Sequence, residues 1–180
     1  MTNDHDRYLC FSLGAEEYAI PLLSVKEVIA LPDITPVPQT VPYFLGIMNL
    51  RGQVISVTDL RLKLSIKPNQ TSETAVIICD LAPNCIGFVV DSINSVMSSS
   101  PEDISKKPDI QSQVSTDYIQ SIYRNKDRLV LILDIAKTVT SSDHQLMARA
   151  TARSPVKLKE QAATLETKEP KSEPSEIAAA

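Results

Sequence analysis

The sequence predicts an all-β protein built from small barrels. About ten short apolar runs follow one another with turn signals between them, and little of the chain has the period of a helix. One run, Leu129–Leu133, is apolar on both faces of a strand, so it needs cover on both sides. Two small barrels in contact would provide that cover.

The composition allows one ordinary domain and excludes several classes of partner. The chain has 180 residues, of which 43% are hydrophobic, which is enough to fill a core. Its net charge of −4, its lack of tryptophan and its 4% aromatic content argue against binding to nucleic acid or to an anionic membrane surface. No apolar run approaches the roughly 18 to 20 residues that span a bilayer. Because the polar amino terminus also lacks a signal-peptide pattern, we expect a cytoplasmic protein without direct membrane insertion.

The first thirty residues predict a hairpin and a third strand. Arg7–Leu13 alternates apolar and polar or smaller side chains, which is typical of a strand with one buried face. Gly14–Glu17 then predicts a turn, and Tyr18–Ile20 predicts a short second strand that ends at Pro21. In Leu22–Leu31 a turn is expected to run into a strand.

The next segment is stiffened by proline. Within eleven residues the chain loses four backbone donors, at Pro32, Pro36, Pro38 and Pro42. This composition predicts an extended surface connection that leads to Tyr43.

The stretch Tyr43–Leu64 is the centre of the predicted organisation. It contains two of only four glycines, Gly46 and Gly52, on either side of Arg51. Glycine permits a positive φ or a close backbone approach, so the two residues predict corners around a short strand with Arg51 at its exit.

A second strand is expected directly after these glycines. Val54, Ile55 and Val57 are apolar and β-branched. Asp59 is placed to cap a turn or short helix that begins at Leu60.

The middle of the chain predicts three more strands and a loop. Thr74–Leu81 is mostly apolar and predicts a buried strand, and Ile86–Asp91 and Ile93–Met97 predict two others. Ser98–Pro108 consists largely of serine, proline and charged residues and predicts a loop.

The last predicted hairpin joins Tyr118–Tyr123 to Leu129–Leu133 through a polar turn at Asn125–Asp127. Asp134 is expected to open a helical turn over Ile135–Val139.

The composition changes after Thr140. The segment 141–180 has no phenylalanine, tyrosine or glycine, and its six basic and six acidic residues are spread among small polar ones. Such a segment buries too little apolar surface to offset its ordering, so it predicts a flexible tail with at most a transient helix over Asp143–Ala150. We therefore expect a domain over 1–140 and a tail over 141–180.

Three aspartates are the obvious candidates for catalysis, because each follows an apolar run: Asp59, Asp91 and Asp134. They could bind a metal, or one could accept a phosphoryl group, but aspartate at such positions more often caps a turn. The alternating strands and long helices of a phosphoacceptor receiver are missing.

Other catalytic patterns are also missing. The two histidines, His5 and His144, lie near the ends of the chain, and no phosphate-binding glycine motif occurs. The cysteines form no C-x-x-C pair and predict ordinary buried or half-buried thiols: Cys10, Cys79 and Cys85. We predict a protein that is not an enzyme and that has neither a metal site nor a cofactor.

Arg51 remains as the candidate binding residue. It could form an internal salt bridge, to Glu27 or Asp59, or it could serve as an interface anchor, where arginine is enriched. The residues alone leave both interpretations open.

Several motifs in order resemble the CheW family of chemotaxis adaptors, from about Tyr8 to Val139. They are F-S-L-G-A-E-E-Y-A-I-P-L from Phe11, V-K-E-V-I from Val25, T-P-V-P from Thr35, F-L-G-I-M-N-L-R-G from Phe44, V-T-D-L-R from Val57, G-F-V-V-D from Gly87 and L-V-L-I-L-D from Leu129. All four glycines stand where the family pattern has one: Gly14, Gly46, Gly52 and Gly87.

The resemblance implies two intertwined SH3-like barrels of five strands each. It also implies a non-catalytic adaptor that couples transmembrane chemoreceptors to the histidine kinase CheA, in the cytoplasm at the receptor array. By motif position, the residues implied to meet the receptor's cytoplasmic tip are Val25, Glu27, Gly46, Arg51, Gly87 and Val96. The residues implied to meet the regulatory domain of CheA are Asp109 and Ile110.

Two alternatives come from other classes. One is a CheW-like scaffold of a non-flagellar pathway, such as pilus motility. The other is a metal-dependent enzyme that uses the three aspartates.

Overall fold

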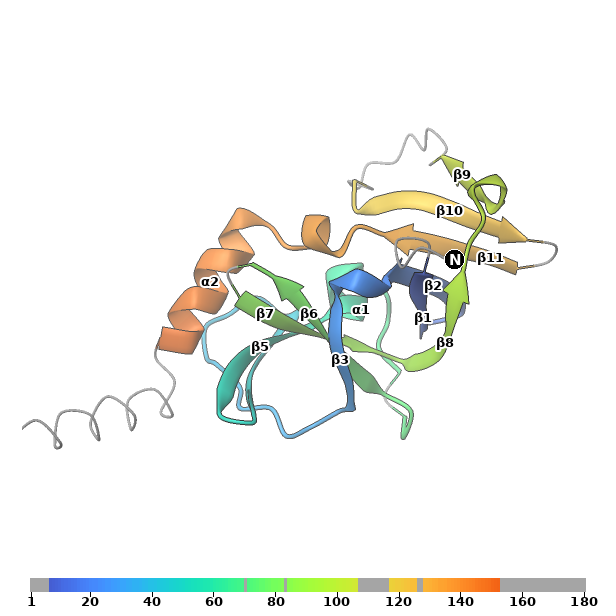
Figure 1. Ribbon diagram of the computed structural model, residues 1–180. Helices are drawn as coiled ribbons and strands as arrows, with labels where there is room; N and C mark the ends of the chain where they lie inside the picture. Colours follow the sequence, from blue (N-terminus) through green and yellow to red (C-terminus); the bar gives the residue numbers. More distant parts are fainter. Residues whose placement is uncertain (1–6, 70, 83, 107–116, 126–127, 153–180) are drawn as a thin grey trace, which may run out of the picture.

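The computed structural model describes residues 7–69, 71–82, 84–106, 117–125 and 128–152. Within these ranges the chain forms two sheets, which confirms the all-β prediction (Figure 1). The six-stranded sheet has the order β8-β1-β2-β11-β10-β9, and the five-stranded sheet has the order β3-β6-β7-β5-β4. The strands are β1 (Arg7–Leu13), β2 (Glu16–Pro21), β3 (Val25–Ala30), β4 (Phe44–Leu50), β5 (Gln53–Asp59), β6 (Ala75–Leu81), β7 (Asn84–Val90), β8 (Ser92–Ser98), β9 (Ile104–Lys106), β10 (Ile119–Asn125) and β11 (Arg128–Leu133).

Two of the short helical elements begin at the capping residues that predict them. The helix α1 (Leu60–Lys63) begins at Asp59, whose side chain accepts hydrogen bonds from the amides of Arg61 and Leu62. The 3-10 turn η4 (Ile135–Thr138) begins at Asp134 in the same way. A further 3-10 turn, η2 (Leu22–Ser24), runs into β3 as expected.

The predicted loop Ser98–Pro108 contains more structure than its composition indicates. It forms the 3-10 turn η3 (Pro101–Asp103) and then β9, which pairs with β10 and adds a sixth strand to the first sheet. The β9 sequence, I-S-K, is too short and polar for a strand pattern. It becomes a strand because Ile104 packs against the core beside the free edge of β10.

The described residues form three apolar cores, one of which joins the two sheets. The inner face of the six-stranded sheet buries one small core around Cys10, Val130 and Ile132, and the five-stranded sheet buries another around Val57 and Val76. The largest core joins the facing sides of both sheets, through residues such as Phe11, Ile20, Ile77, Phe88 and Leu133.

The strand β11 contributes to two of these cores. Val130 and Ile132 lie in the small core of their own sheet, whereas Leu131 and Leu133 pack in the shared core. This arrangement confirms that Val130–Leu133 is covered on both sides, whereas Leu129 at the start of the predicted run is 48% exposed.

The proline-rich segment is an extended connection, as predicted. Its one bridge joins Thr35 to Ile47, with backbone hydrogen bonds of 2.8 and 3.0 Å. This bridge covers part of the outer edge of β4, which is the last strand of its sheet.

The prediction of a flexible segment from residue 141 onward is wrong for its first twelve residues. Ser141–Ala152 forms the helix α2, which lies beside β5 and β7 at the end of the five-stranded sheet (Figure 1). The helix is ordered by burial of Asp143, Met147 and Ala150, a set too small to stand out in a polar sequence. Residues 153–180 lie outside the described part of the chain.

Candidate functional site

Arg51 and Gly52 form the two-residue loop of the β4–β5 hairpin. Leu50 pairs with Gln53 on either side of it. Both loop residues have positive φ, 52° for Arg51 and 85° for Gly52, as in a type I′ turn. Asn49 stabilises the loop, because its Oδ1 accepts a hydrogen bond of 2.8 Å from the Gly52 amide. The predicted corner at Gly52 is therefore confirmed, and the corner aims Arg51 outward.

Gly46 does not form the predicted corner, because it lies inside β4. The pairing register with β5 shifts between Phe44 and Gly46, and Gly46 has a φ of 140°. A Cβ at this position would lie 2.1 Å from the carbonyl oxygen of Thr35. The glycine is thus needed for a bulge and for the close approach of the proline-rich segment.

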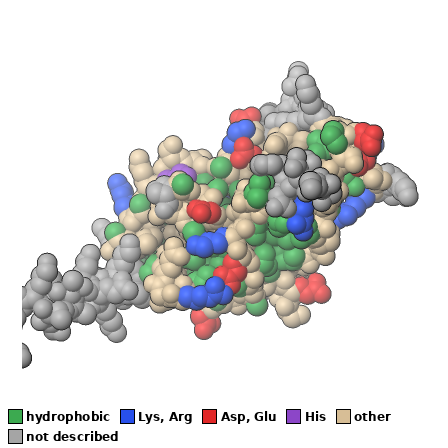
Figure 2. All heavy atoms as spheres, in the orientation of Figure 1, with side chains coloured by type: hydrophobic (Ala, Val, Ile, Leu, Met, Phe, Trp, Pro, Cys, Tyr) green, Lys and Arg blue, Asp and Glu red, His purple; other side chains and the backbone are tan. Residues whose placement is uncertain are grey.

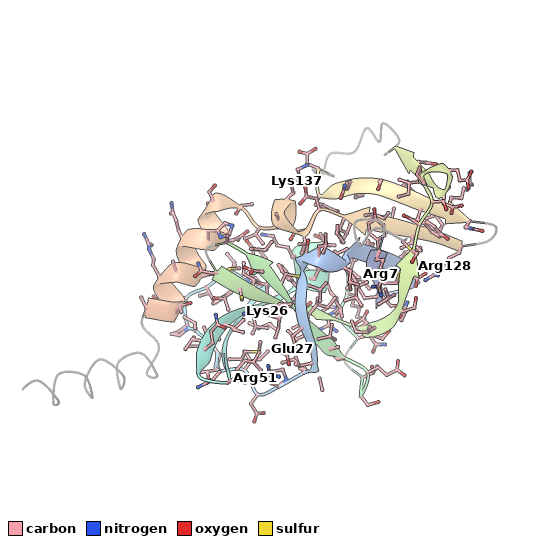
Figure 3. The ribbon with its side chains drawn as sticks, in the orientation of Figure 1. Arg7, Lys26, Glu27, Arg51, Arg128 and Lys137 are labelled. Atoms are coloured by element: carbon pink, nitrogen blue, oxygen red, sulfur yellow. The ribbon has the colours of Figure 1, made fainter. Side chains whose placement is uncertain are left out.

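Arg51 forms an ion pair with Glu27. Its Nη2 donates to Oε1 of Glu27 at 2.7 Å, so Glu27 and not Asp59 is its internal partner. Glu27 lies on β3 and Arg51 follows β4, which are the two end strands of the sheet order. The pair therefore joins the two ends of a curled sheet (Figure 3).

This ion pair leaves Arg51 available to a partner. The Arg51 side chain is 77% exposed, against 25% for Glu27. At such exposure, solvent screening limits the contribution of the pair to stability to about 1 kcal/mol or less. A guanidinium with five donors, fixed at its base by the turn and at its tip by one carboxylate, can bind further acceptors.

The other receptor-facing residues implied by the resemblance fall into two groups. Val25 lies half-buried on β3 beside Glu27, and Val96 lies on β8 with 47% of its surface exposed. Gly46 and Gly87 are buried, so they contact only other atoms of this chain. A Cβ on Gly87 would lie 2.8 Å from Cγ1 of Val76, which shows that this glycine permits close packing of β6 and β7.

An apolar face lies between β3 and β8. Figure 2 shows hydrophobic side chains gathered there, between the two sheets. Exposed apolar side chains on these elements and on η2 include Leu23, Val28 and Val96. A hollow of about 470 Å³ lies between β3 and the start of β8, lined in part by Val28 and Ile93.

The three aspartates are held by internal partners. The Arg61 guanidinium donates to both oxygens of Asp59, at 3.0 and 2.7 Å, and to Asp91 at 2.7 Å. Asp91 also accepts a 2.7 Å hydrogen bond from the amide of Gly14, in the β1–β2 turn. Asp134 caps η4 and pairs with Lys137 at 3.3 Å.

The Arg61 network gives Asp59 and Asp91 a structural role, and Asp134 has one as the cap of η4. Hydrogen bonding to Asp59, and then to Asp91, holds the pKa of Arg61 above its usual value, so the guanidinium stays charged between the two carboxylates. In the described ranges, no group of three or more histidine, cysteine or acidic side chains is arranged to hold a metal ion.

The cysteines are buried or half-buried thiols, as predicted. Burial raises the pKa of the Cys79 thiol to about 12 and also raises that of Cys10. Cys85 is half-buried, and the Lys26 ammonium lies 3.4 Å from its sulfur.

Three of the predicted residues lie outside the described part of the chain: Asp109, Ile110 and His5. The other histidine, His144, lies on α2. Across the described ranges, no helix has both the length and the apolar character needed to cross a membrane.

Sequence reasoning missed one polar cluster, formed by Tyr43, Lys63 and Asp143. The buried Asp143 carboxylate accepts from the Tyr43 hydroxyl at 2.7 Å and pairs with the Lys63 ammonium. The spacing T-x-x-D from Thr140 to Asp143 is a helix-start signal that predicts where α2 begins, but it does not predict the contacts of Asp143 with Tyr43 and Lys63.

The whole fold has known relatives. Residues 7–143 match the CheW-like domain family. A chemotaxis protein CheW from Helicobacter pylori is 33% identical over 130 residues, covering 72% of this chain and 78% of that protein. A chemotaxis protein CheW from Klebsiella aerogenes is 30% identical over 141 residues, covering 78% of this chain and 85% of that protein.

A solved structure agrees with these matches. The crystal structure of the scaffolding protein TtCheW from Thermoanaerobacter tengcongensis superposes with a TM-score of 0.70 at 26% identity, covering 77% of this chain and 94% of that one. The matched region contains both sheets and every motif that carries the resemblance. The chain therefore belongs to the CheW-like domain family.

Proposed function

We propose that the protein is a non-catalytic adaptor that couples transmembrane chemoreceptors to the histidine kinase CheA in chemotaxis arrays, at the cytoplasmic side of the membrane. Membership of the family supports the adaptor class. The observation that carries the proposal is Arg51, an exposed arginine held at positive φ in the β4–β5 turn.

The turn supports a binding role for Arg51, because its backbone conformation is unfavourable for a residue that has a Cβ. A residue with a Cβ in the left-handed region loses roughly 1 to 2 kcal/mol relative to glycine. The Arg51–Glu27 pair is too exposed to repay much of that cost in stability. Strain of this kind concentrates at functional sites, where a specific side chain is needed in a specific direction.

The neighbouring surface fits a helical partner. Arg51 and Glu27 supply a charged rim, and the apolar face between β3 and β8 supplies area that an apolar helix face can cover. We assign direct receptor contacts to Arg51, Glu27, Val25 and Val96. The buried Gly46 and Gly87 act indirectly, because they set the positions of β4 and β7.

The kinase-facing surface is proposed on the resemblance alone. It would include Asp109 and Ile110, which lie outside the described part of the chain. The adaptor function requires this surface to be distinct from the Arg51 turn, so that both partners can bind at once.

The experiment that tests this function is affinity capture with the purified, tagged protein from a lysate of its own cells, with bound proteins identified by mass spectrometry. We expect a chemoreceptor and CheA to be captured together by the wild-type protein. The Arg51→Ala variant is expected to keep CheA and lose the receptor. Capture of neither partner, or equal loss of both in the variant, would contradict the proposal.

A further inference from the structure

The helix α2 is the one described element that lies mostly beyond the region matched to the family. The match ends at residue 143, whereas α2 runs from Ser141 to Ala152. It packs on the β4–β5 hairpin, on the side opposite the small core of that sheet. Its position raises the question of what it does to the hairpin that carries Arg51.

A buried carboxylate anchors the start of α2. Asp143 accepts hydrogen bonds from the Tyr43 hydroxyl, from the Lys63 ammonium, and from the Thr140 amide and hydroxyl. The side chains of Asp143 and Lys63 are only 4% and 12% exposed. The Lys63 ammonium also lies 3.9 Å from the centre of the Tyr43 ring. One carboxylate thus joins α2 to α1 and to the residue that precedes β4.

The rest of the helix rests on the hairpin itself. Met147 and Ala150 are buried in the same core as Phe44 and Ile47 of β4. Near the end of the helix, the hydroxyl of Thr151 lies 3.4 Å from that of Ser56 in the middle of β5.

The helix is less well supported on its other side. A hollow of about 360 Å³ separates part of α2 from the proline-rich segment, between Val37–Thr40 and residues such as Leu146 and Arg149. Because few atoms fill this side, the Asp143 anchor and the contacts with the hairpin carry the docking of the helix.

The hairpin needs such support because one of its strands, β4, is an edge of the sheet, whereas β5 also pairs with β7. The strand β4 pairs along its length only with β5, apart from the single bridge to Thr35. An edge strand opens locally more easily than a central strand, and opening becomes more frequent when an element that packs on the strand is lost.

We propose that Asp143 is a positioning residue: by anchoring α2, it holds the β4–β5 hairpin closed and keeps the Arg51 turn ordered for the partner. Release of the anchor loosens this hairpin while the two sheets stay folded. The part of this inference that concerns partner affinity rests on the adaptor function proposed above.

Amide hydrogen exchange of the full chain tests the mechanical part. Asp143→Asn removes the charge that pairs with Lys63. Asp134→Asn is the matched control, because it makes the same change at the cap of η4, where the carboxylate pairs with Lys137 and with none of the partners of Asp143. We expect exchange roughly tenfold faster in α2, β4 and β5 of Asp143→Asn, with β6 and β7 at the wild-type rate. Wild-type exchange in the hairpin, or equal acceleration in every strand, would overturn the proposal.

A milder variant keeps the proposal testable if Asp143→Asn fails to fold. Tyr43→Phe removes one hydrogen bond to Asp143 and keeps the ring beneath Lys63. It is expected to accelerate exchange in the same elements by a smaller factor. Acceleration elsewhere but not in the hairpin would count against the anchor.

Binding to a purified receptor cytoplasmic fragment tests the functional part. The affinity should fall in Asp143→Asn and less in Tyr43→Phe, in proportion to hairpin opening, and stay unchanged in Asp134→Asn. Faster hairpin exchange with unchanged affinity would overturn the coupling. If the wild-type protein fails to bind the fragment, the adaptor proposal fails, and the exchange rates alone decide whether Asp143 positions the hairpin.

Discussion

At the scale of single residues, the hairpin turn shows how this chain uses a conformation that most side chains avoid. Arg51 and Gly52 both have positive φ, yet only one of them is glycine. An asparagine or glycine at position 51 would suit the turn better. The sequence motif could predict the turn and the direction of Arg51, whereas the choice of Glu27 as its partner depends on sheet curvature that only the fold supplies.

Arg51→His is expected to weaken receptor binding and to leave the fold intact. Histidine lacks the planar fork of five donors and, near neutral pH, most of the charge. We expect a loss of about 2 kcal/mol, which is about thirtyfold in the dissociation constant. The measurement is calorimetry with a receptor cytoplasmic fragment, beside a thermal melt.

The control for this variant is Arg124→His, which changes an exposed arginine on β10 of the other sheet. It should bind the receptor fragment as the wild type does. Wild-type affinity in the Arg51→His variant would show that Arg51 has no role in recognition. A loss of stability as large as the loss of affinity would instead indicate that the main role of Arg51 is its ion pair with Glu27.

The two glycines beside Arg51 predict different costs of substitution. Gly46→Ala would place a Cβ 2.1 Å from a backbone oxygen of Thr35, so the proline-rich segment must move. We expect a loss of about 3 kcal/mol or more in the free energy of unfolding. Gly52→Ala meets open space and should lose only about 1 kcal/mol, from its positive φ. Denaturant unfolding of both variants checks that Gly46→Ala loses more stability than Gly52→Ala. Equal losses of stability would show that the close contact between position 46 and Thr35 does not determine the cost.

The capping aspartates also differ in expected cost. The sequence predicts a cap at Asp59 and Asp134 alike, which would be worth roughly 0.5 to 2 kcal/mol each. The structure adds a buried fork from Arg61 to Asp59, so Asp59→Asn should cost more, about 3 to 5 kcal/mol, because it breaks a buried ion pair. Asp134→Asn should stay within the range of a cap. Urea unfolding that gives Asp59→Asn no more than the cost of Asp134→Asn would contradict the structural importance of the Arg61 fork.

At the scale of elements, the strands were predictable where apolar residues alternate or cluster. The strands β1, β6 and β11 match their predicted ranges to within a residue at each end. The strand β9 and the stable docking of α2 were not predictable, because their order comes from contacts with distant parts of the chain, although a transient helix was expected over Asp143–Ala150. Asp143 is the clearest case, since a charged residue in a polar segment carries no sign that Tyr43 and Lys63 will bury it.

The docking of α2 predicts a pH dependence. Burial raises the pKa of Asp143, but hydrogen bonds from Lys63, Tyr43 and Thr140 outweigh burial and lower the pKa from 3.8 to about 2. A pKa lowered by folding adds stability above the unfolded value, and this stability is lost as the pH falls from about 4 towards 2. The loss should be about 2 kcal/mol.

Urea unfolding between pH 5 and pH 2.5 measures this loss in the wild type against Asp143→Asn. The variant has no carboxyl to titrate at position 143, so the stability difference between the two proteins should shrink as the pH falls. A difference that stays constant over this range would show that folding does not lower the pKa of Asp143.

At the scale of the whole molecule, the two sheets are parts of one folded unit. They share the core that contains Phe11, Phe88 and Leu133, and α2 extends this core to Ala150. The doubly apolar run of β11 predicted this sharing, because no single barrel could cover both faces of the strand. The six-to-five division of the strands and the inclusion of α2 could not be predicted, since each depends on which edge remains free after the sheets form.

The central claim is that this single unit binds a receptor and a kinase at the same time. The most direct measurement is the sedimentation of CheA with vesicles that display the receptor cytoplasmic fragment, as the concentration of this protein is raised. An adaptor predicts that CheA reaches the vesicles only when the protein is present. It also predicts that recruitment rises and then falls at excess protein, because separate copies then occupy each partner. Recruitment of CheA that is independent of the protein, or unchanged by Arg51→His, would contradict the account.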